Sequence, residues 1–196
     1  SLVELTVAAR SDVGMIRSGN EDAFFAHATR ERGVFIVADG MGGHAAGEVA
    51  SEMAVQIVSR ELHELNDVYG EAARLRVAES LRIANRAIYD RTIQESDKQG
   101  MGTTASVLVM SGARYLIGQV GDSRVYLLRD GALRQLTKDH SYVQEQVDAG
   151  FLTPEQARYH PYSNVITRCV GASDVVEPDT YSGELKVGDV FLVASD

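Results

Sequence analysis

The residues best suited to do chemistry are aspartates that close apolar stretches of the sequence. Asp39, Asp122 and Asp196 each end a run that predicts a buried strand. A carboxylate in such a place is costly unless it is hydrogen-bonded or bound to a cation. One alone is typical of a turn. Three together, with an acidic pair at Glu21 and Asp22, favour a shared site for a hard divalent cation, which takes oxygen ligands.

Asp39 is distinguished further by the glycines that follow it. It begins the run DGMGGH, which ends at His44 and holds three glycines in the four positions after the aspartate. Glycine lets the backbone turn sharply and come close to a ligand. The imidazole of His44 titrates near neutral pH, so it could transfer a proton. A helix-capping role is the alternative for this histidine.

The sequence argues against a zinc or thiol site. No Cys/His set has the spacing of a zinc site. The five histidines are scattered along the chain: His27, His44, His63, His140 and His160. Cys169, the single cysteine, lies in residues 164–170, which read as a buried strand, so we expect an inert thiol rather than a nucleophile. One cysteine allows no internal disulfide, and nothing indicates an oxidising compartment.

The composition is that of an ordinary globular domain. The chain has 196 residues, 44% of them hydrophobic, which is enough for one domain over 1–196 with a substantial core. Its net charge of −9 argues against nucleic-acid binding, which needs a basic surface. The sequence has no apolar run near eighteen residues and no signal-peptide pattern. We therefore expect a cytoplasmic monomer without membrane insertion.

Hydrophobic periodicity predicts strands, then two long helices, then strands again. The helical stripes cover about 46–65 and 72–94. Strands are expected at 4–9, 23–28, 33–38, 103–110, 114–120, 124–129, 164–170, 175–181 and 190–194. Residues 141–162 interrupt them with a short helix near 142–149 and look like an excursion from the sheet. The order favours an α+β fold in which helices cover mainly antiparallel sheet.

With these motifs collected, the chain resembles the PPM family (protein phosphatase type 2C), in particular its compact bacterial members. The matching runs appear in family order from one end to the other. They are RSGNED from Arg17, DGMGGHAAGE from Asp39, GTTA from Gly102, GQVGDSR from Gly118 and VASD from Val193. The second and fourth runs are highly specific, whereas GTTA alone is weak. Together they make a chance match improbable.

The resemblance implies an αββα sandwich of two mainly antiparallel sheets flanked by helices, with a metal centre at one end. By motif position, Asp39 would bridge two metal ions, with the Gly40 carbonyl as a further ligand. Asp196 would bind the first metal, and Asp122 would share a third, weaker ion with it.

The remaining motif residues would lie around these ligands or on the substrate. Glu21 would hold metal-bound water, supported by Asp22. Arg17 would be catalytic and bind the substrate phosphate, because arginine offers a planar fork for phosphoryl oxygens. His44 would be the general acid that protonates the leaving oxygen.

The activity implied is that of a hydrolase acting on phosphoserine and phosphothreonine in proteins. A hydroxide bridging a binuclear or trinuclear Mn²⁺ or Mg²⁺ centre would attack phosphorus, since two close cations can lower the pKa of a bridging water. The expected partners are phosphoproteins made by a bacterial-type serine/threonine kinase, which places the protein in signalling.

Two expectations concern the extent of the domain. The family pattern continues beyond Asp196, so the chain is expected to be an incomplete catalytic domain lacking the last helix and strand. A non-catalytic fragment, or a pseudophosphatase that binds phosphoprotein, is therefore the alternative function. Residues 141–162 fall where the family carries its flap, and both substrate contact and a plain surface loop stay open for them.

Overall fold

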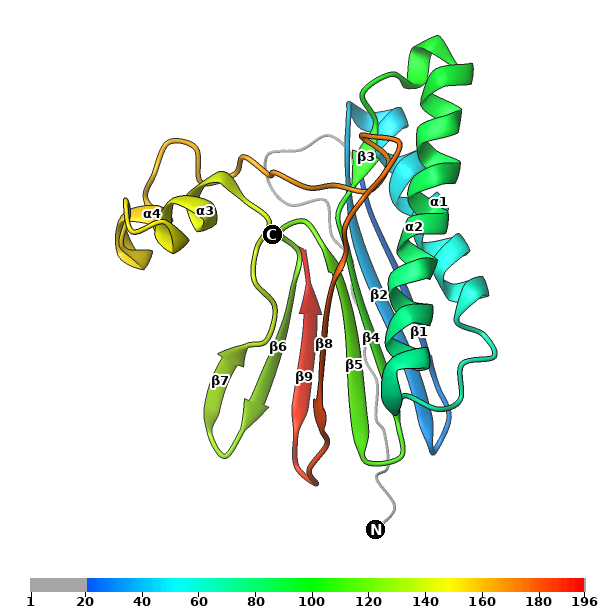
Figure 1. Cartoon of the computed structure of the whole chain (residues 1–196), viewed down its shortest axis with the longest axis vertical. Coiled ribbons are helices and arrows are strands. Elements are labelled where there is room, and N and C mark those ends of the chain that lie inside the picture. The colour runs from blue at the N-terminus through cyan, green and yellow to red at the C-terminus, as the bar shows by residue number, and fades with distance from the viewer. Residues whose placement is uncertain (1–20, 196) are drawn as a thin grey trace.

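The computed structural model describes residues 21–195, and these form two antiparallel sheets with two long helices on one side (Figure 1). The strand predicted at 4–9 lies outside the described residues. The described strands are β1 (Asp22–Ala28), β2 (Arg32–Met41), β3 (Gly102–Thr103), β4 (Ala105–Ser111), β5 (Arg114–Val120), β6 (Arg124–Arg129), β7 (Ala132–Gln135), β8 (Asp179–Glu184) and β9 (Val190–Ala194). The helices are α1 (His44–Glu61), α2 (Gly70–Gln94), α3 (Tyr142–Asp148) and α4 (Pro154–Arg158), with a 3-10 turn η1 (Ser96–Lys98).

The larger sheet has the order β1-β2-β4-β5-β8, with β3 paired to the end of β2. In β2, Val34, Ile36 and Ala38 are buried under the helices, whereas Phe35 packs on the opposite face. Successive side chains of a strand point to opposite faces, so both faces of β2 carry apolar residues. This explains why the strand reads as a continuous apolar run.

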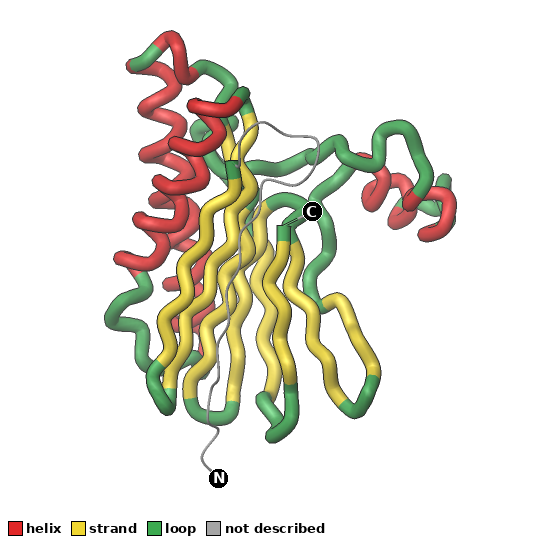
Figure 2. The backbone as a smooth tube through the Cα atoms, turned by 180° about the vertical axis from the view of Figure 1, so that it is seen from behind, coloured by secondary structure: helices red, strands yellow, loops and turns green. Residues whose placement is uncertain are grey.

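The two long helices cover one face of this sheet (Figure 2). The predicted stripe of α2 is fully buried: Val77, Leu81, Ala84 and Ile88 have no exposed surface. At Gly118 of β5 a methyl group would lie 2.6 Å from a methyl carbon of Val77. The absence of a side chain at Gly118 therefore lets α2 lie close to the sheet. None of the helices in the described residues combines the length and apolar character needed to cross a membrane.

The smaller sheet has the order β7-β6-β9 and packs against the face of the larger sheet that the helices leave open. The contact is a second apolar cluster, with Leu108 and Ile117 from the larger sheet and Val125 from the smaller one. Tyr115 and Phe191 meet edge to face, with ring centroids 5.3 Å apart. Two antiparallel sheets with helices, as predicted for the fold class, are confirmed.

The predicted boundaries are wrong in three places. Residues 164–170, all described, form no strand; only isolated bridges remain, Ile166 with Ser141 and Val170 with Thr103. β8 begins at Asp179, although the apolar pattern predicted a strand from 175. α1 ends at Glu61 rather than at 65. Residues 164–170 are also mostly exposed or partly buried, with only Val170 buried, so the prediction of a buried strand there is wrong in burial as well as in pairing. Partners that lie far away in sequence decide whether a segment with such a pattern becomes a strand.

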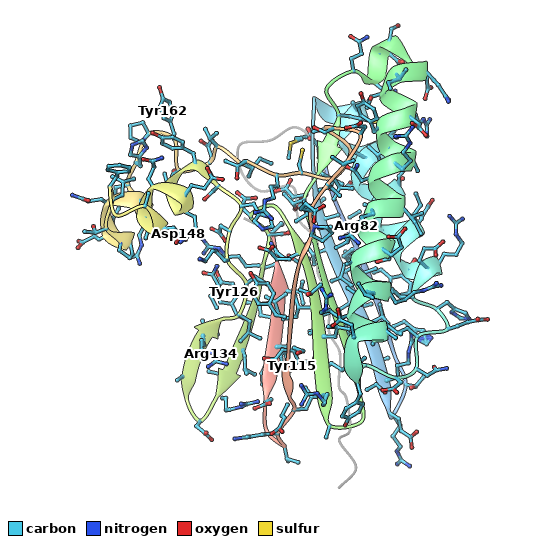
Figure 3. All side chains as sticks on the ribbon, viewed as in Figure 1. Arg82, Tyr115, Tyr126, Arg134, Asp148 and Tyr162 are labelled. Carbon is cyan, nitrogen blue, oxygen red and sulfur yellow. The ribbon has the colours of Figure 1, made fainter. Side chains whose placement is uncertain are left out.

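Residues 141–162 leave the sheets and carry two short helices, which Figure 3 shows away from the strands at the labels Asp148 and Tyr162. The start of α3 is capped by the hydroxyl of Ser141, which accepts a hydrogen bond from the Gln144 amide at 3.2 Å. α4 begins with a capping box between Thr153 and Gln156. Such local signals fix short helices without a large buried face.

Candidate metal centre

Asp39 stands at the end of β2, where main-chain bonds hold it from both sides. Its Cα is paired with that of Asp22 on β1. Its N–H donates to the Thr104 hydroxyl at 3.0 Å, and its carbonyl accepts from the Thr104 N–H at 2.9 Å. The next amide, that of Gly40, donates to the Glu21 carbonyl at 3.1 Å. The position of Asp39 is therefore set by the strands on either side of it.

The glycines of this motif allow α1 to start directly against the strand ends. A methyl group at Gly40 would overlap the carbonyl oxygen of Gly47 in the first turns of α1. A methyl group at Gly47 would overlap the carboxylate of Glu21. The Glu21 carboxylate thus lies against the beginning of α1, where the helix dipole favours negative charge.

Asp122 follows β5 in a tight turn that is held by buried side chains. Gly121 has a φ of +100°, and a methyl group there would lie 2.6 Å from Cγ2 of Thr104. The buried amide of Gln119 donates to the Gly121 carbonyl at 3.1 Å and to the Ser123 carbonyl at 2.6 Å. Thr104 bonds Asp39 on one side and packs on Gly121 on the other. Asp39 and the turn that carries Asp122 therefore lie on opposite sides of Thr104.

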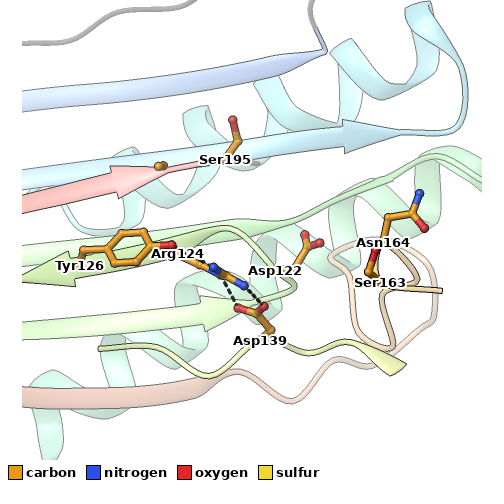
Figure 4. A pocket seen from close by; sticks show the side chains of 8 residues that line it. Asp122, Arg124, Tyr126, Asp139, Ser163, Asn164 and Ser195 are labelled. Carbon is orange, nitrogen blue, oxygen red and sulfur yellow. Dashed lines mark hydrogen bonds and ion pairs between the residues drawn. The ribbon is translucent and has the colours of Figure 1, made fainter. Parts of the chain in front are cut away.

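A cavity of about 280 Å³ opens beside Asp122 (Figure 4). Its lining comes from β6, the end of β9 and three loops: Asp122, Arg124, Tyr126, Asp139, Ser163, Asn164, Ala194 and Ser195. The guanidinium of Arg124 donates two hydrogen bonds to the Asp139 carboxylate, at 2.9 and 2.6 Å, and one to the Tyr126 hydroxyl. The bonds to Asp139 raise the pKa of Arg124, so this side chain stays charged.

The end of β9 is tied to the first acidic group. The hydroxyl of Ser195 donates to the Asp22 carboxylate at 2.8 Å, and Ser195 also lines the cavity beside Asp122. The structure therefore brings Asp22 of β1 next to Asp39 and Gly40 of β2, with Glu21 directly before β1 and the Asp122 turn across Thr104.

Other predicted site residues are placed only in part. Arg17 and Asp196 lie outside the described residues, and His44 is the first residue of α1, after the N-cap Gly43. Within 21–195, no three His, Cys, Asp or Glu side chains come close enough together to hold a metal ion by themselves.

The chemistry of the described donors fits a hard cation. Asp22 and Asp39 stand opposite each other on paired antiparallel strands. Like charges in that arrangement repel, and a divalent cation nearby offsets the repulsion. The donors at this end are carboxylates and a main-chain carbonyl, the oxygen ligands that Mg²⁺ and Mn²⁺ take. Cys169 is half-buried, and burial raises the pKa of its thiol, so it is a poor nucleophile.

Sequence reasoning missed the residues that hold the Asp122 turn. Gln119 lies inside an apolar run, and a buried amide needs partners; that was an available signal. His140 was noted only as one of five scattered histidines. In the structure Asp179 begins β8, and its carboxylate lies 2.7 Å from Nε2 of His140.

Comparison with known proteins decides the family. A family model described as "Protein phosphatase 2C" matches residues 16–196. The chain belongs to the protein phosphatase 2C family. The resemblance inferred from the motifs is thereby confirmed.

Named relatives agree with this membership. The serine/threonine protein phosphatase PstP of Mycobacterium tuberculosis is 42% identical over 192 residues, which cover 98% of this chain and 36% of that protein. The solved serine/threonine phosphatase of S. agalactiae is 39% identical with a TM-score of 0.85, over 93% of this chain and 75% of that one. The catalytic domain of PstP in complex with two manganese ions is 39% identical with a TM-score of 0.79. The match covers 95% of this chain and 75% of that one.

The coverage values also show how much of each relative this chain matches. This protein phosphatase 2C chain spans about a third of the length of the M. tuberculosis PstP protein and about three quarters of the solved phosphatase chains. It is shorter than those relatives and shares their fold over nearly all of its own length.

Proposed function

We propose that this chain hydrolyses phosphoserine and phosphothreonine in proteins with the help of bound Mn²⁺ or Mg²⁺. The observation that carries the proposal is the placement of Glu21, Asp22 and Asp39 beside one another at the start of β1 and the end of β2, with the turn that carries Asp122 on the other side of Thr104. Its support is membership of the protein phosphatase 2C family, together with relatives named serine/threonine phosphatases. One of these was solved with two manganese ions.

The proposed ligands are oxygen atoms from four residues: Asp39, Gly40 through its carbonyl, Asp122 and Asp196. Asp39, Gly40 and Asp196 would hold two ions, and a third, weaker ion would be shared by Asp122 and Asp196. Glu21 and Asp22 would orient water around the ions, because outer partners of this kind set ligand geometry. When bound, the ions supply an activated water and positive charge for the phosphoryl oxygens.

Two further residues are proposed to act on the substrate. Arg17 would bind the phosphoryl oxygens through its planar fork and offset their developing charge. His44 would donate a proton to the departing serine or threonine oxygen, a contribution of about 10²- to 10⁴-fold for a well-placed general acid. The substrate would need no covalent bond to the protein, which is consistent with the raised pKa of Cys169.

The proposed setting is bacterial signalling in the cytoplasm. The partners would be phosphoproteins made by a bacterial-type serine/threonine kinase, and the chain would act as a monomeric catalytic domain over 1–196. Residues 141–162 are proposed as the flap beside the substrate. Phe151 and Tyr159, 76% and 77% exposed, offer aromatic surface for peptide contact there.

The test is turnover of p-nitrophenyl phosphate and of a phosphothreonine peptide with added Mn²⁺. It uses the 196-residue chain and a chimera extended by the segment of the S. agalactiae phosphatase that follows the region matched by this chain. We expect Mn²⁺-dependent release of phosphate that Asp39→Asn abolishes. Asp189→Asn is the matched control, because Asp189 lies in the turn before β9, at the other end of that strand from Ser195.

Two results would contradict the proposal. One is the absence of turnover in both proteins with Mn²⁺ present; the other is full activity of Asp39→Asn. Binding of the phosphopeptide without turnover in either protein would favour the non-catalytic alternative.

A further inference from the structure

His140 is a buried histidine that binds the residue before Asp122 through both its main chain and its ring. The side chain is 5% exposed. The His140 N–H donates to the Gly121 carbonyl at 2.9 Å, and the Gly121 N–H donates to Nδ1 of the ring at 3.0 Å. These two bonds hold the peptide units on both sides of Gly121, the second of which leads to Asp122.

The bonds of the two ring nitrogens decide which of them carries the proton. Nδ1 accepts a hydrogen bond, so it carries no proton, and the neutral ring must carry its proton on Nε2. Nε2 donates to the Asp179 carboxylate at 2.7 Å. Asp179 also accepts from Arg168 at 3.3 Å, and the Arg168 guanidinium donates to the Glu177 carbonyl as well. The tautomer and the plane of the ring are therefore set by a chain of partners.

The same histidine stands where both ends of the 141–162 excursion return to the sheets. The Thr167 N–H donates to the His140 carbonyl at 2.9 Å. The next residue, Ser141, forms an isolated bridge with Ile166. Asp179 is paired with Gln119 of β5, whose amide holds the Asp122 turn from the other side. A shift of His140 would thus move the turn and the base of the excursion together.

We propose that His140 is a positioning residue that sets the Asp122 carboxylate for metal binding through the Gly121 amide, with Asp179 holding the required tautomer. The proposal rests on the proposed role of Asp122 as a metal ligand. His140 acts one residue away from that ligand, by orienting the peptide that carries it. Outer partners that orient ligands change metal affinity or activity by about 10- to 100-fold when removed.

Two substitutions separate the functions of the two ring nitrogens. In His140→Asn the side-chain amide stands near the place of Nδ1, so its oxygen can still accept from Gly121. In His140→Gln the amide stands near the place of Nε2, so it can still donate to Asp179 but leaves the Gly121 N–H without its acceptor. Both variants lose a buried bond, and we expect both to melt a few degrees lower.

The readout that separates positioning from stability is metal dependence. We expect His140→Gln to raise the Mn²⁺ concentration for half-maximal turnover by about 10-fold or more, and His140→Asn to stay near the wild type. Asp179→Leu removes the acceptor of the Nε2 proton at a half-exposed site and should shift this concentration in the same direction as His140→Gln. Equal metal dependence in the two His140 variants and the wild type would overturn the proposal.

A readout independent of turnover comes from NMR. Long-range ¹H–¹⁵N spectra of the wild type should show Nδ1 of His140 without a proton and Nε2 with one. Titration with Mg²⁺ should shift the Asp122 amide at lower concentrations in wild type and His140→Asn than in His140→Gln. A proton on Nδ1, or identical titrations, would refute the positioning role.

The NMR series also keeps the two proposals apart. If Mg²⁺ shifts the wild-type amide but no phosphate is released, the proposed function fails and the Mg²⁺ series alone decides the role of His140. If Mg²⁺ produces no shift in the wild type, both proposals are wrong.

Discussion

Asp39 and Asp122 stand at the same end of the molecule, yet the protein holds them by different means. Asp39 is held by main-chain pairing: its Cα is opposite that of Asp22 on β1, and its amide and carbonyl both bond Thr104. Asp122 depends more on side chains. The Gln119 amide bonds the Gly121 and Ser123 carbonyls, and the His140 ring accepts from the Gly121 N–H, beside one main-chain bond from His140 to Gly121.

The difference predicts where each site is vulnerable. A position set by several strand bonds keeps its place when one neighbouring side chain changes, although its glycines must stay small. A position set by a few buried polar side chains depends on each of them, because a buried group that loses its partner costs about 1–3 kcal/mol. The predictions below test that contrast, from the largest expected effect to the smallest.

The largest effect is expected from removing the charge of Asp39. Asp39→Asn should lower Mn²⁺-dependent turnover by more than about 100-fold. This exceeds the loss of about 10- to 100-fold that follows removal of a residue that only orients a metal ligand. Asp122→Asn, at the proposed weaker ion, should lower it by about 10-fold. Phosphate release over a range of Mn²⁺ concentrations measures both. Equal losses in the two variants would remove the distinction between the ions.

The next effect is steric and tests the main-chain side of the comparison. Gly40→Ala places a methyl group on the Gly47 carbonyl, so α1 must shift, and we expect a loss of about 2–3 kcal/mol in the free energy of unfolding. Gly43→Ala is the control: it meets no atom within 4 Å, and its φ of +92° should cost about 1–2 kcal/mol. Urea unfolding measures both, and a larger loss at Gly43 would contradict the close approach.

A pair of buried polar substitutions compares the two aspartates directly. Gln119→Leu removes the donor to the Gly121 and Ser123 carbonyls, and we expect a loss of about 2 kcal/mol together with a weaker response to Mn²⁺. Thr104→Val keeps the methyl group against Gly121 but removes the acceptor of the Asp39 N–H. We expect about 1 kcal/mol and an unchanged Mn²⁺ response, because the pairing with β1 remains.

The smallest effect concerns a carboxylate with a structural role only. Hydrogen bonds from Arg129 lower the pKa of Asp189. Burial raises this pKa in part, and the hydrogen bond from the Lys186 amide lowers it further. A folded-state pKa below the unfolded one means that this stabilisation is present above the unfolded pKa. It is lost as pH falls through the folded pKa.

Asp189→Asn should therefore lower stability at pH 7 and have little effect at pH 2, with turnover unchanged. Urea unfolding at the two pH values measures the stability difference. A loss of the same size at both pH values would show that charge has no part in it.

The sequence by itself determined much of this protein. It placed α2 over nearly its whole length, most strands, and Asp39 and Asp122 at strand ends, because hydrophobic periodicity and glycine-rich turns are local signals. The family resemblance also follows from motifs in the sequence, and the match over 16–196 confirms the family.

Only the tertiary structure decided how the Asp122 turn is held and where the chain returns to the sheets. The partners concerned are far apart in sequence: Asp179 is 39 residues from His140, and Val170 bridges to Thr103. Residues 164–170 carry a strand-like pattern and yet form no strand. Of these seven residues only Val170 is buried, so the local pattern misreported their burial as well as their pairing. Both the burial and the partner of such a segment are fixed only when the whole chain has packed.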